Sequence, residues 1–203
     1  MCKYNDDSHQ ENYLTHDAYK PLDEVYDDAQ LASGGGFTSG MIASAMQNTP
    51  LVNACNQFAR RVMTRLGIQI PPVSTVAVPY PLANNMYDAL IGGIDLNWMQ
   101  VGMGHNAIST AIDQVNSGRP TIAIRRGNPG HVAVVWPQNR IDTSSARDIT
   151  EVRRLLRQGC MLAQGSLNPN LTRRSISLGD AWIESQIDTV RFFSFIGRPF
   201  TFY

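Results

Sequence analysis

Apolar residues in the first third of the chain recur every three or four positions, the spacing of one helical face. This spacing predicts a helix over 41–47 and a second one that begins at Pro50 or Asn53 and ends at Leu66. Pro50 separates the two, because proline suits a first helical turn and breaks a helix interior. Gly67 is the expected C-cap. Similar spacing predicts further helices over 84–90, 106–116 and 148–157.

The pattern changes in the last third of the chain to short apolar runs bounded by turn residues. Residues 120–125 and 131–136 are predicted strands, and Arg126-Gly-Asn-Pro-Gly130 between them is rich in the residues that form turns. The two strands should therefore form a hairpin. Further candidate strands are 160–163, 175–178 and 189–195. Because helices precede strands, the predicted class is α+β, with N-terminal helices packed on a central antiparallel β-sheet.

The segments 68–84 and 95–98 interrupt this order. Residues 68–84 are rich in proline and are expected to be mostly extended. Residues 95–98 are expected to form a loop or short turn between two of the helices.

Charge and glycine content divide the chain near residue 40. Residues 1–28 hold eight acidic residues and two lysines, which leaves nine acidic residues and fifteen arginines in 29–203, a net charge of 15 − 9 = +6. The sequence Ser33-Gly-Gly-Gly-Phe-Thr-Ser-Gly40 has the composition of a flexible connector. We therefore predict an acidic flexible leader with a Gly-rich linker over 1–40 and one globular domain over 41–203. The cationic domain favours an anionic partner, although an ordinary solvated surface has the same composition.

Composition excludes several classes of protein. Hydrophobic residues make up 43% of the chain and charged residues 17%, which is typical of a globular protein and not of a disordered one. Three cysteines without regular spacing argue against a disulfide framework, and no CxxC or HxxxH motif suggests a metal site. We expect no cofactor and no metal. The apolar runs are too short to span a bilayer, and the acidic first thirty residues are unlike a signal peptide.

Cys55 and His131 are the residues best suited to catalysis. Cys55 lies near the amino end of a predicted helix, where the helix dipole favours a thiolate. His131 begins a predicted strand directly after Gly130, a position from which an imidazole can reach a thiol and take its proton. The alternatives are a buried structural cysteine and a histidine that caps a turn. His105, in a Gly-rich loop, is a weaker candidate.

The order of these motifs resembles that of the papain-like NlpC/P60 and CHAP amidases. The resemblance is strongest to the first group of the type VI secretion amidase effectors, and it covers about residues 53–182 but not the leader. The motifs that carry it are Cys55-Asn-Gln-Phe58, Leu66-Gly-Ile68, Ala83-Asn-Asn-Met86, Trp98 and Gly130-His-Val-Ala-Val-Val135.

The resemblance implies a papain-like NlpC/P60 fold and a peptidoglycan amidase or endopeptidase. Such an enzyme cleaves an amide of the stem peptides, commonly the bond between D-glutamate and meso-diaminopimelate. Cys55 would attack the carbonyl and its amide would help to form the oxyanion hole, while His131 would serve as base and then as acid. By order along the chain, Gln164 best matches the residue that orients the histidine, and the alternatives are Ser166, Asn168 and Asp142.

The same reading gives Asn56, Arg125 and Ser166 as candidate substrate-binding residues. Arg125 lies beside the hairpin turn and is suited to a stem carboxylate, although a solvated turn is an equal alternative.

The implied biological role is that of a secreted antibacterial effector. It would be made in the cytoplasm without a signal peptide and delivered by a contractile, type VI-like system into the periplasm of a target cell. Expected partners are peptidoglycan stem peptides, a cognate immunity protein, and a secretion component or chaperone bound to the leader. Nucleic-acid binding and membrane insertion are not expected. Two alternatives stay open: a papain-fold protease or deamidase acting on proteins, and a non-catalytic component of a secretion or phage particle.

Overall fold

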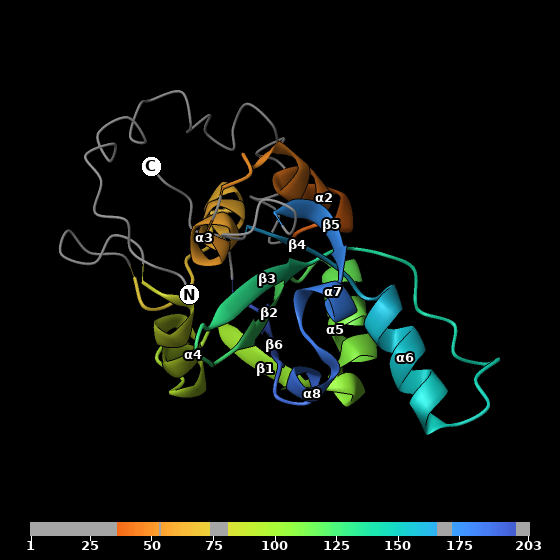
Figure 1. Ribbon diagram of the computed structural model, residues 1–203. Helices are drawn as coiled ribbons and strands as arrows, with labels where there is room; N and C mark the ends of the chain where they lie inside the picture. Colours follow the sequence, from red (N-terminus) through yellow and green to blue (C-terminus); the bar gives the residue numbers. More distant parts are fainter. Residues whose placement is uncertain (1–35, 53, 74–80, 166–171, 198–203) are drawn as a thin grey trace.

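The computed structural model describes residues 36–52, 54–73, 81–165 and 172–197 (Figure 1). It contains a six-stranded sheet in the order β1-β6-β2-β3-β4-β5, and every neighbouring pair is antiparallel. The strands are β1 (Trp98–Met103), β2 (Thr121–Arg125), β3 (His131–Val135), β4 (Met161–Gln164), β5 (Arg173–Ser177) and β6 (Arg191–Phe195). The helices are α2 (Ser39–Asn48), α3 (Cys55–Arg65), α4 (Ala83–Ile91), η4 (His105–Ala107), α5 (Ile108–Asn116), α6 (Ile149–Gly159), α7 (Leu178–Ala181) and α8 (Glu184–Ile187).

The predicted α+β class with an antiparallel sheet is confirmed. The β2–β3 hairpin forms in the register that the alternation requires, with Ala123 opposite Ala133 and Ile124 opposite Val132. The predicted strands of the last third are all present, with shifts of one or two residues at their ends.

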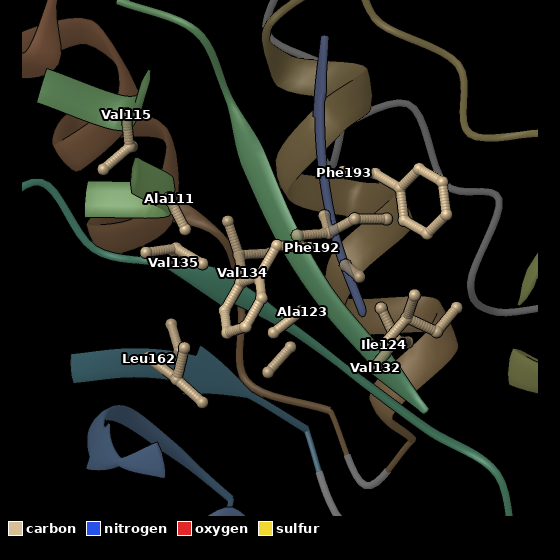
Figure 2. Packing of buried hydrophobic residues seen from close by; sticks show 14 of the residues in the cluster. Ala111, Val115, Ala123, Ile124, Val132, Val134, Val135, Leu162, Phe192 and Phe193 are labelled. Atoms are coloured by element: carbon tan, nitrogen blue, oxygen red, sulfur yellow. The ribbon is translucent and has the colours of Figure 1, made fainter. Parts of the chain in front are cut away.

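Helices cover both faces of the sheet. In Figure 1, α3 and α4 lie on one side, and α5, α6 and α7 lie on the other. Figure 2 shows Ile124, Val132 and Phe193 on one side of the central strands and Val135 with the α5 side chains on the other. Because a strand turns successive side chains to opposite faces, these runs can be apolar throughout and still fill two cores.

The helices begin and end as their local sequences require. Asp148 accepts a hydrogen bond from the Glu151 amide and caps α6, while the Glu151 carboxylate accepts one from the Arg147 amide. The C-cap of α3 is Leu66, one residue before the predicted Gly67, and Gly67 follows it with φ of 65°, the left-handed conformation that commonly terminates a helix. The second predicted helix starts later than expected, at Cys55, because Ala54 is still extended (φ −149°, ψ 121°).

The folded body begins earlier than residue 41. Phe37 is buried and its ring packs edge-on against Phe195, with centroids 6.4 Å apart. The Thr38 hydroxyl accepts a hydrogen bond from the Met41 amide and caps α2, so Gly40 belongs to a helix. Residues 1–35 of the predicted leader and linker lie outside the described residues, as do 74–80 of the proline-rich segment.

Strand β1 is the main element that the sequence did not predict. The loop expected over 95–98 is correct up to Asn97, but Trp98 starts a strand. Its pairing with β6 is interrupted by a bulge between Gln100 and Gly102, which removes the strict alternation that marks a strand. Gly102 also lies where a Cβ would come within 2.9 Å of the Ala107 side chain. Helices α7 and α8 were not predicted either, because four residues are too few to show helical periodicity.

Candidate active site

Cys55 is the first residue of α3 and is 2% exposed. The first N–H groups of a helix have no partner within the helix, and the dipole makes this end positive. A thiolate at the first helical position is therefore electrostatically favoured. Cys160 provides a contrast, because burial raises the pKa of its thiol to about 12 and leaves it without nucleophilic character near neutral pH.

Gly165 brings the end of β4 against the chain that leads into α3. A Cβ built on this glycine would lie 2.6 Å from the Ala54 carbonyl oxygen, a separation that real side chains do not adopt. Helix α3 also packs against both β3 and β4. Cys55 and Gln164 each adjoin one of the two residues in this contact, so the amino end of α3 and the end of β4 meet at one place.

His131 and Gln164 are joined by a short hydrogen bond. His131 Nε2 lies 2.5 Å from Gln164 Oε1, and the Gln164 side chain is 1% exposed. An amide oxygen only accepts, so His131 Nε2 must carry the hydrogen. In the neutral ring the lone pair is then on Nδ1, which makes Nδ1 the basic atom of this histidine.

Trp182 packs on the imidazole of His131. The ring centroids are 5.1 Å apart and the planes meet at 65°, an edge-to-face contact. Trp182 is 3% exposed, and its Nε1 has no hydrogen-bond partner among the described residues. Trp182 therefore removes water from one side of the histidine that Gln164 contacts.

The turn that precedes His131 is fixed by the start of α4. Asn84 donates to the Gly127 carbonyl at 2.9 Å and accepts from the Gly127 amide at 3.1 Å. Gly130 lies against the same side chain, and a Cβ there would be 2.9 Å from Asn84 Cγ. The side-chain amide of Asn84 thus contacts both Gly127 and Gly130 of the hairpin turn. These contacts fix the position of His131, the first residue of β3.

The predicted substrate-binding residues have different settings. Asn56 is buried, and its side chain donates to the Pro81 carbonyl at 3.0 Å, which ties α3 to the chain before α4. Arg125 ends β2 directly opposite His131. Ser166 lies outside the described residues, so its role stays a prediction, as does substrate binding by the other two.

Among the residues considered for orienting the histidine, Gln164 is in contact with His131. Asp142 is exposed in the connection before α6, where it accepts a hydrogen bond from the Ser144 amide at 2.8 Å. A hydrogen bond from the Ser144 side chain, together with that from the Ser144 amide, holds the pKa of Asp142 below its usual range. Asn168 and Ser166 lie outside the described residues.

A second histidine, His105, is paired with Asp188 at the same end of the strands as His131. Sequence reasoning missed this pair. His105 Nδ1 lies 2.9 Å from Asp188 Oδ1, with the histidine 4% exposed and the carboxylate 62% exposed. This hydrogen bond, with the charges of His105 and Arg153, lowers the pKa of Asp188. Gly104 permits the contact, because a Cβ there would be 3.1 Å from Asp188 Cα. Eighty-three residues separate the two partners, so no local pattern reveals the pair.

The comparisons with known proteins find no matching family model and no curated protein that is significantly similar to this sequence. Over the described residues, no group of three or more His, Cys, Asp or Glu side chains is arranged to hold a metal ion. None of the helices in these same ranges has the length and apolar character needed to cross a bilayer.

The contact between Gly165 and Ala54 predicts a specific effect of Gly165→Ala. The new methyl group must displace the Ala54 carbonyl and with it the start of α3, so we expect a loss of about 1–3 kcal/mol of unfolding free energy. Denaturant unfolding measures this loss. Gly36→Ala is the matched control, because a Cβ there meets nothing within 4 Å. An unchanged midpoint for Gly165→Ala would contradict the close approach of β4 and α3.

The His105–Asp188 pair predicts a pH-dependent contribution to stability. Because the folded pKa of Asp188 is lowered, its stabilising effect is present above the ordinary carboxyl value of about 4 and is lost as the pH falls through the folded value. Asp188→Asn should therefore lower Tm most near neutral pH, and the two melting curves should converge below about pH 4. A difference in Tm that does not change between pH 7 and pH 3 would contradict this assignment.

Proposed function

We propose that Cys55, His131 and Gln164 form the catalytic group of a cysteine hydrolase with a papain-like fold. The observation that carries this proposal is the 2.5 Å contact between His131 Nε2 and Gln164 Oε1, which leaves Nδ1 as the basic nitrogen. The position of Cys55 at the amino end of α3 supplies the nucleophile. Its meeting with the end of β4 at Gly165 supports a common site for all three residues.

The residues divide the reaction between them. His131 Nδ1 takes the proton from Cys55 Sγ, and the thiolate attacks the amide carbonyl carbon. The Cys55 N–H stabilises the resulting oxyanion, and His131 then protonates the leaving amine to give a thioester. Water, deprotonated by His131, attacks the thioester and releases the acid and the free thiol. While His131 is an imidazolium, its Nε2–H donates to Gln164 and keeps the ring oriented.

We propose that the substrate is an amide of the peptidoglycan stem peptide, between D-glutamate and meso-diaminopimelate. The order of motifs from Cys55 to Val135 supports this choice, as does the net positive charge of residues 29–203, which suits an anionic cell wall. On this proposal the protein is an antibacterial effector that a type VI-like machine delivers to the periplasm of a target cell. Its partners are then a cognate immunity protein and a secretion component or chaperone.

One observation favours a second candidate, a non-catalytic component of a secretion or phage particle. Cys55 is 2% exposed, as an inert structural cysteine would be. Iodoacetamide labelling near neutral pH distinguishes the two, because a nucleophilic thiolate alkylates faster than free cysteine and an inert buried thiol alkylates more slowly. A slow rate that matches that of Cys160 would favour the non-catalytic candidate.

The proposed function predicts that Cys55→Ala abolishes hydrolysis of purified peptidoglycan, because no other group in the site can form the thioester. The measurement is the appearance of new amine termini, with the fragments identified by mass spectrometry. Cys160→Ala is the matched control and should retain activity, since that thiol lies outside the site. Undiminished release by Cys55→Ala would eliminate the mechanism. New termini from a protein substrate but none from peptidoglycan would support the protease or deamidase alternative.

Gln164→Ala should lower kcat without removing activity. Loss of one hydrogen bond to the imidazolium is worth about 1.5–3 kcal/mol, which corresponds to a reduction of roughly 10- to 150-fold. Gln164→Glu keeps an acceptor oxygen and should retain more activity than the alanine variant. Steady-state kinetics on a soluble stem peptide measure both. Equal kcat values for wild type and Gln164→Ala would show that Gln164 has no part in orienting His131.

A further inference from the structure

Arg125 and His131 lie at the same end of the neighbouring strands β2 and β3. It is the last residue of β2, and the hairpin register places it directly opposite His131, the first residue of β3. Residues opposite each other in an antiparallel pair extend to the same face, with Cβ atoms about 5 Å apart. The arginine therefore starts from the same patch of the sheet as the proposed base.

The head of Arg125 is held in place by two features of neighbouring loops. Its Nε donates to the Thr189 hydroxyl at 2.9 Å, and that hydroxyl in turn donates to the Gln186 carbonyl at 2.7 Å. On the other side lies Gly127, where a Cβ would be 2.6 Å from Arg125 Nη1. Because Gly127 has no side chain, the Arg125 guanidinium can lie against the turn.

Arg125 differs in its charge environment from Arg126, the next residue in the turn. Arg126 pairs with Asp88 at 2.9 Å, whereas Arg191, which lies opposite Ile124 on β6, donates like Arg125 to a neutral hydroxyl, that of Tyr87. Within the described part of the chain, no carboxylate lies within ion-pair distance of Arg125, and its partner there is a neutral hydroxyl. The charge of this half-buried guanidinium is therefore not balanced by a carboxylate, and its terminal N–H groups can donate to an incoming anion.

We propose that Arg125 is a specificity-determining residue that binds a free carboxylate of the peptide substrate, within about one residue of the scissile amide. The inference rests on the proposed function of the Cys55–His131 site. A guanidinium fork matches a carboxylate with two parallel hydrogen bonds, whereas a carboxamide offers one acceptor and carries no charge. The preferred substrate is therefore an acidic peptide, and the carboxylate belongs to the residue on the acyl side or on the amine side of the bond.

The experiment uses three synthetic stem peptides that differ only at carboxylates next to the scissile bond. One keeps both carboxylates, one has the acyl-side carboxylate converted to carboxamide, and one has the amine-side carboxylate converted. The full chain is assayed for kcat/KM on each peptide as wild type and as Arg125→Gln. Gly127→Ala is a second variant that displaces the guanidinium without removing its charge. Arg126→Gln is the matched control. Arg126 is the next residue along the chain from Arg125, but it is exposed and pairs with Asp88.

For wild type and Arg126→Gln, we expect the fully acidic peptide to be preferred over one of the two amides by about 10- to 100-fold in kcat/KM. In Arg125→Gln that ratio should fall to near one, and in Gly127→Ala it should fall part of the way. The amide that shows the preference identifies the carboxylate. A ratio unchanged in Arg125→Gln, or an equal loss on all three peptides, would overturn the inference.

Binding to the Cys55→Ala protein separates this inference from the proposed function. Calorimetric titration of that variant with the same three peptides does not depend on turnover. Discrimination that requires Arg125, with no hydrolysis by wild type, would support the carboxylate site and overturn the catalytic proposal. Hydrolysis by wild type without discrimination, or no binding of any peptide, would overturn the carboxylate site.

Discussion

The contact between Gly165 and the Ala54 carbonyl is the constraint on which the candidate site depends. One end of this contact leads directly into Cys55, and the other follows Gln164. Any side chain at 165 would force the two apart, and the separation would displace both Cys55, the proposed nucleophile, and Gln164, which is hydrogen-bonded to His131. The site is thus assembled by backbone packing, and its polar side chains act within a geometry that a glycine permits.

A second layer of contacts fixes the histidine. The Asn84 side chain is hydrogen-bonded to the turn before His131, Gln164 accepts a hydrogen bond from one ring nitrogen, and Trp182 packs against the ring. These three residues come from different elements, α4, β4 and the α7–α8 connection. Each removes one freedom of the imidazole: where the strand begins, how the ring turns, and how much water reaches it. The proposed catalytic role, with a neutral Gln in place of a carboxylate, requires preorganisation of this kind.

Sequence reasoning was strongest where local patterns coincide with structure. The helices around Cys55 and the β2–β3 hairpin follow from periodicity and turn residues, and order along the chain indicates Gln164, which contacts His131. It failed for β1, where a bulge removes alternation, and for the contacts of Trp182 with His131, Thr189 with Arg125 and Asp188 with His105, which join residues 51 or more positions apart. Such contacts depend on tertiary packing, which leaves no local trace in composition or spacing. The papain-like fold and the catalytic roles stay proposals.

The order of the strands bears on how the molecule is made. Strand β6, the last along the chain among the described strands, lies between β1 and β2 and pairs with both. Until residues 191–195 have been synthesised, β1 therefore has no strand that joins it to β2. Thr189, whose hydroxyl accepts the hydrogen bond from Arg125, is also synthesised only shortly before β6. A nascent chain can form the β2–β3 hairpin early, but it lacks a closed sheet and an ordered arginine beside His131. If the protein is a hydrolase that is harmful to its producer, translation itself delays the appearance of the complete site until residues 191–195 have emerged.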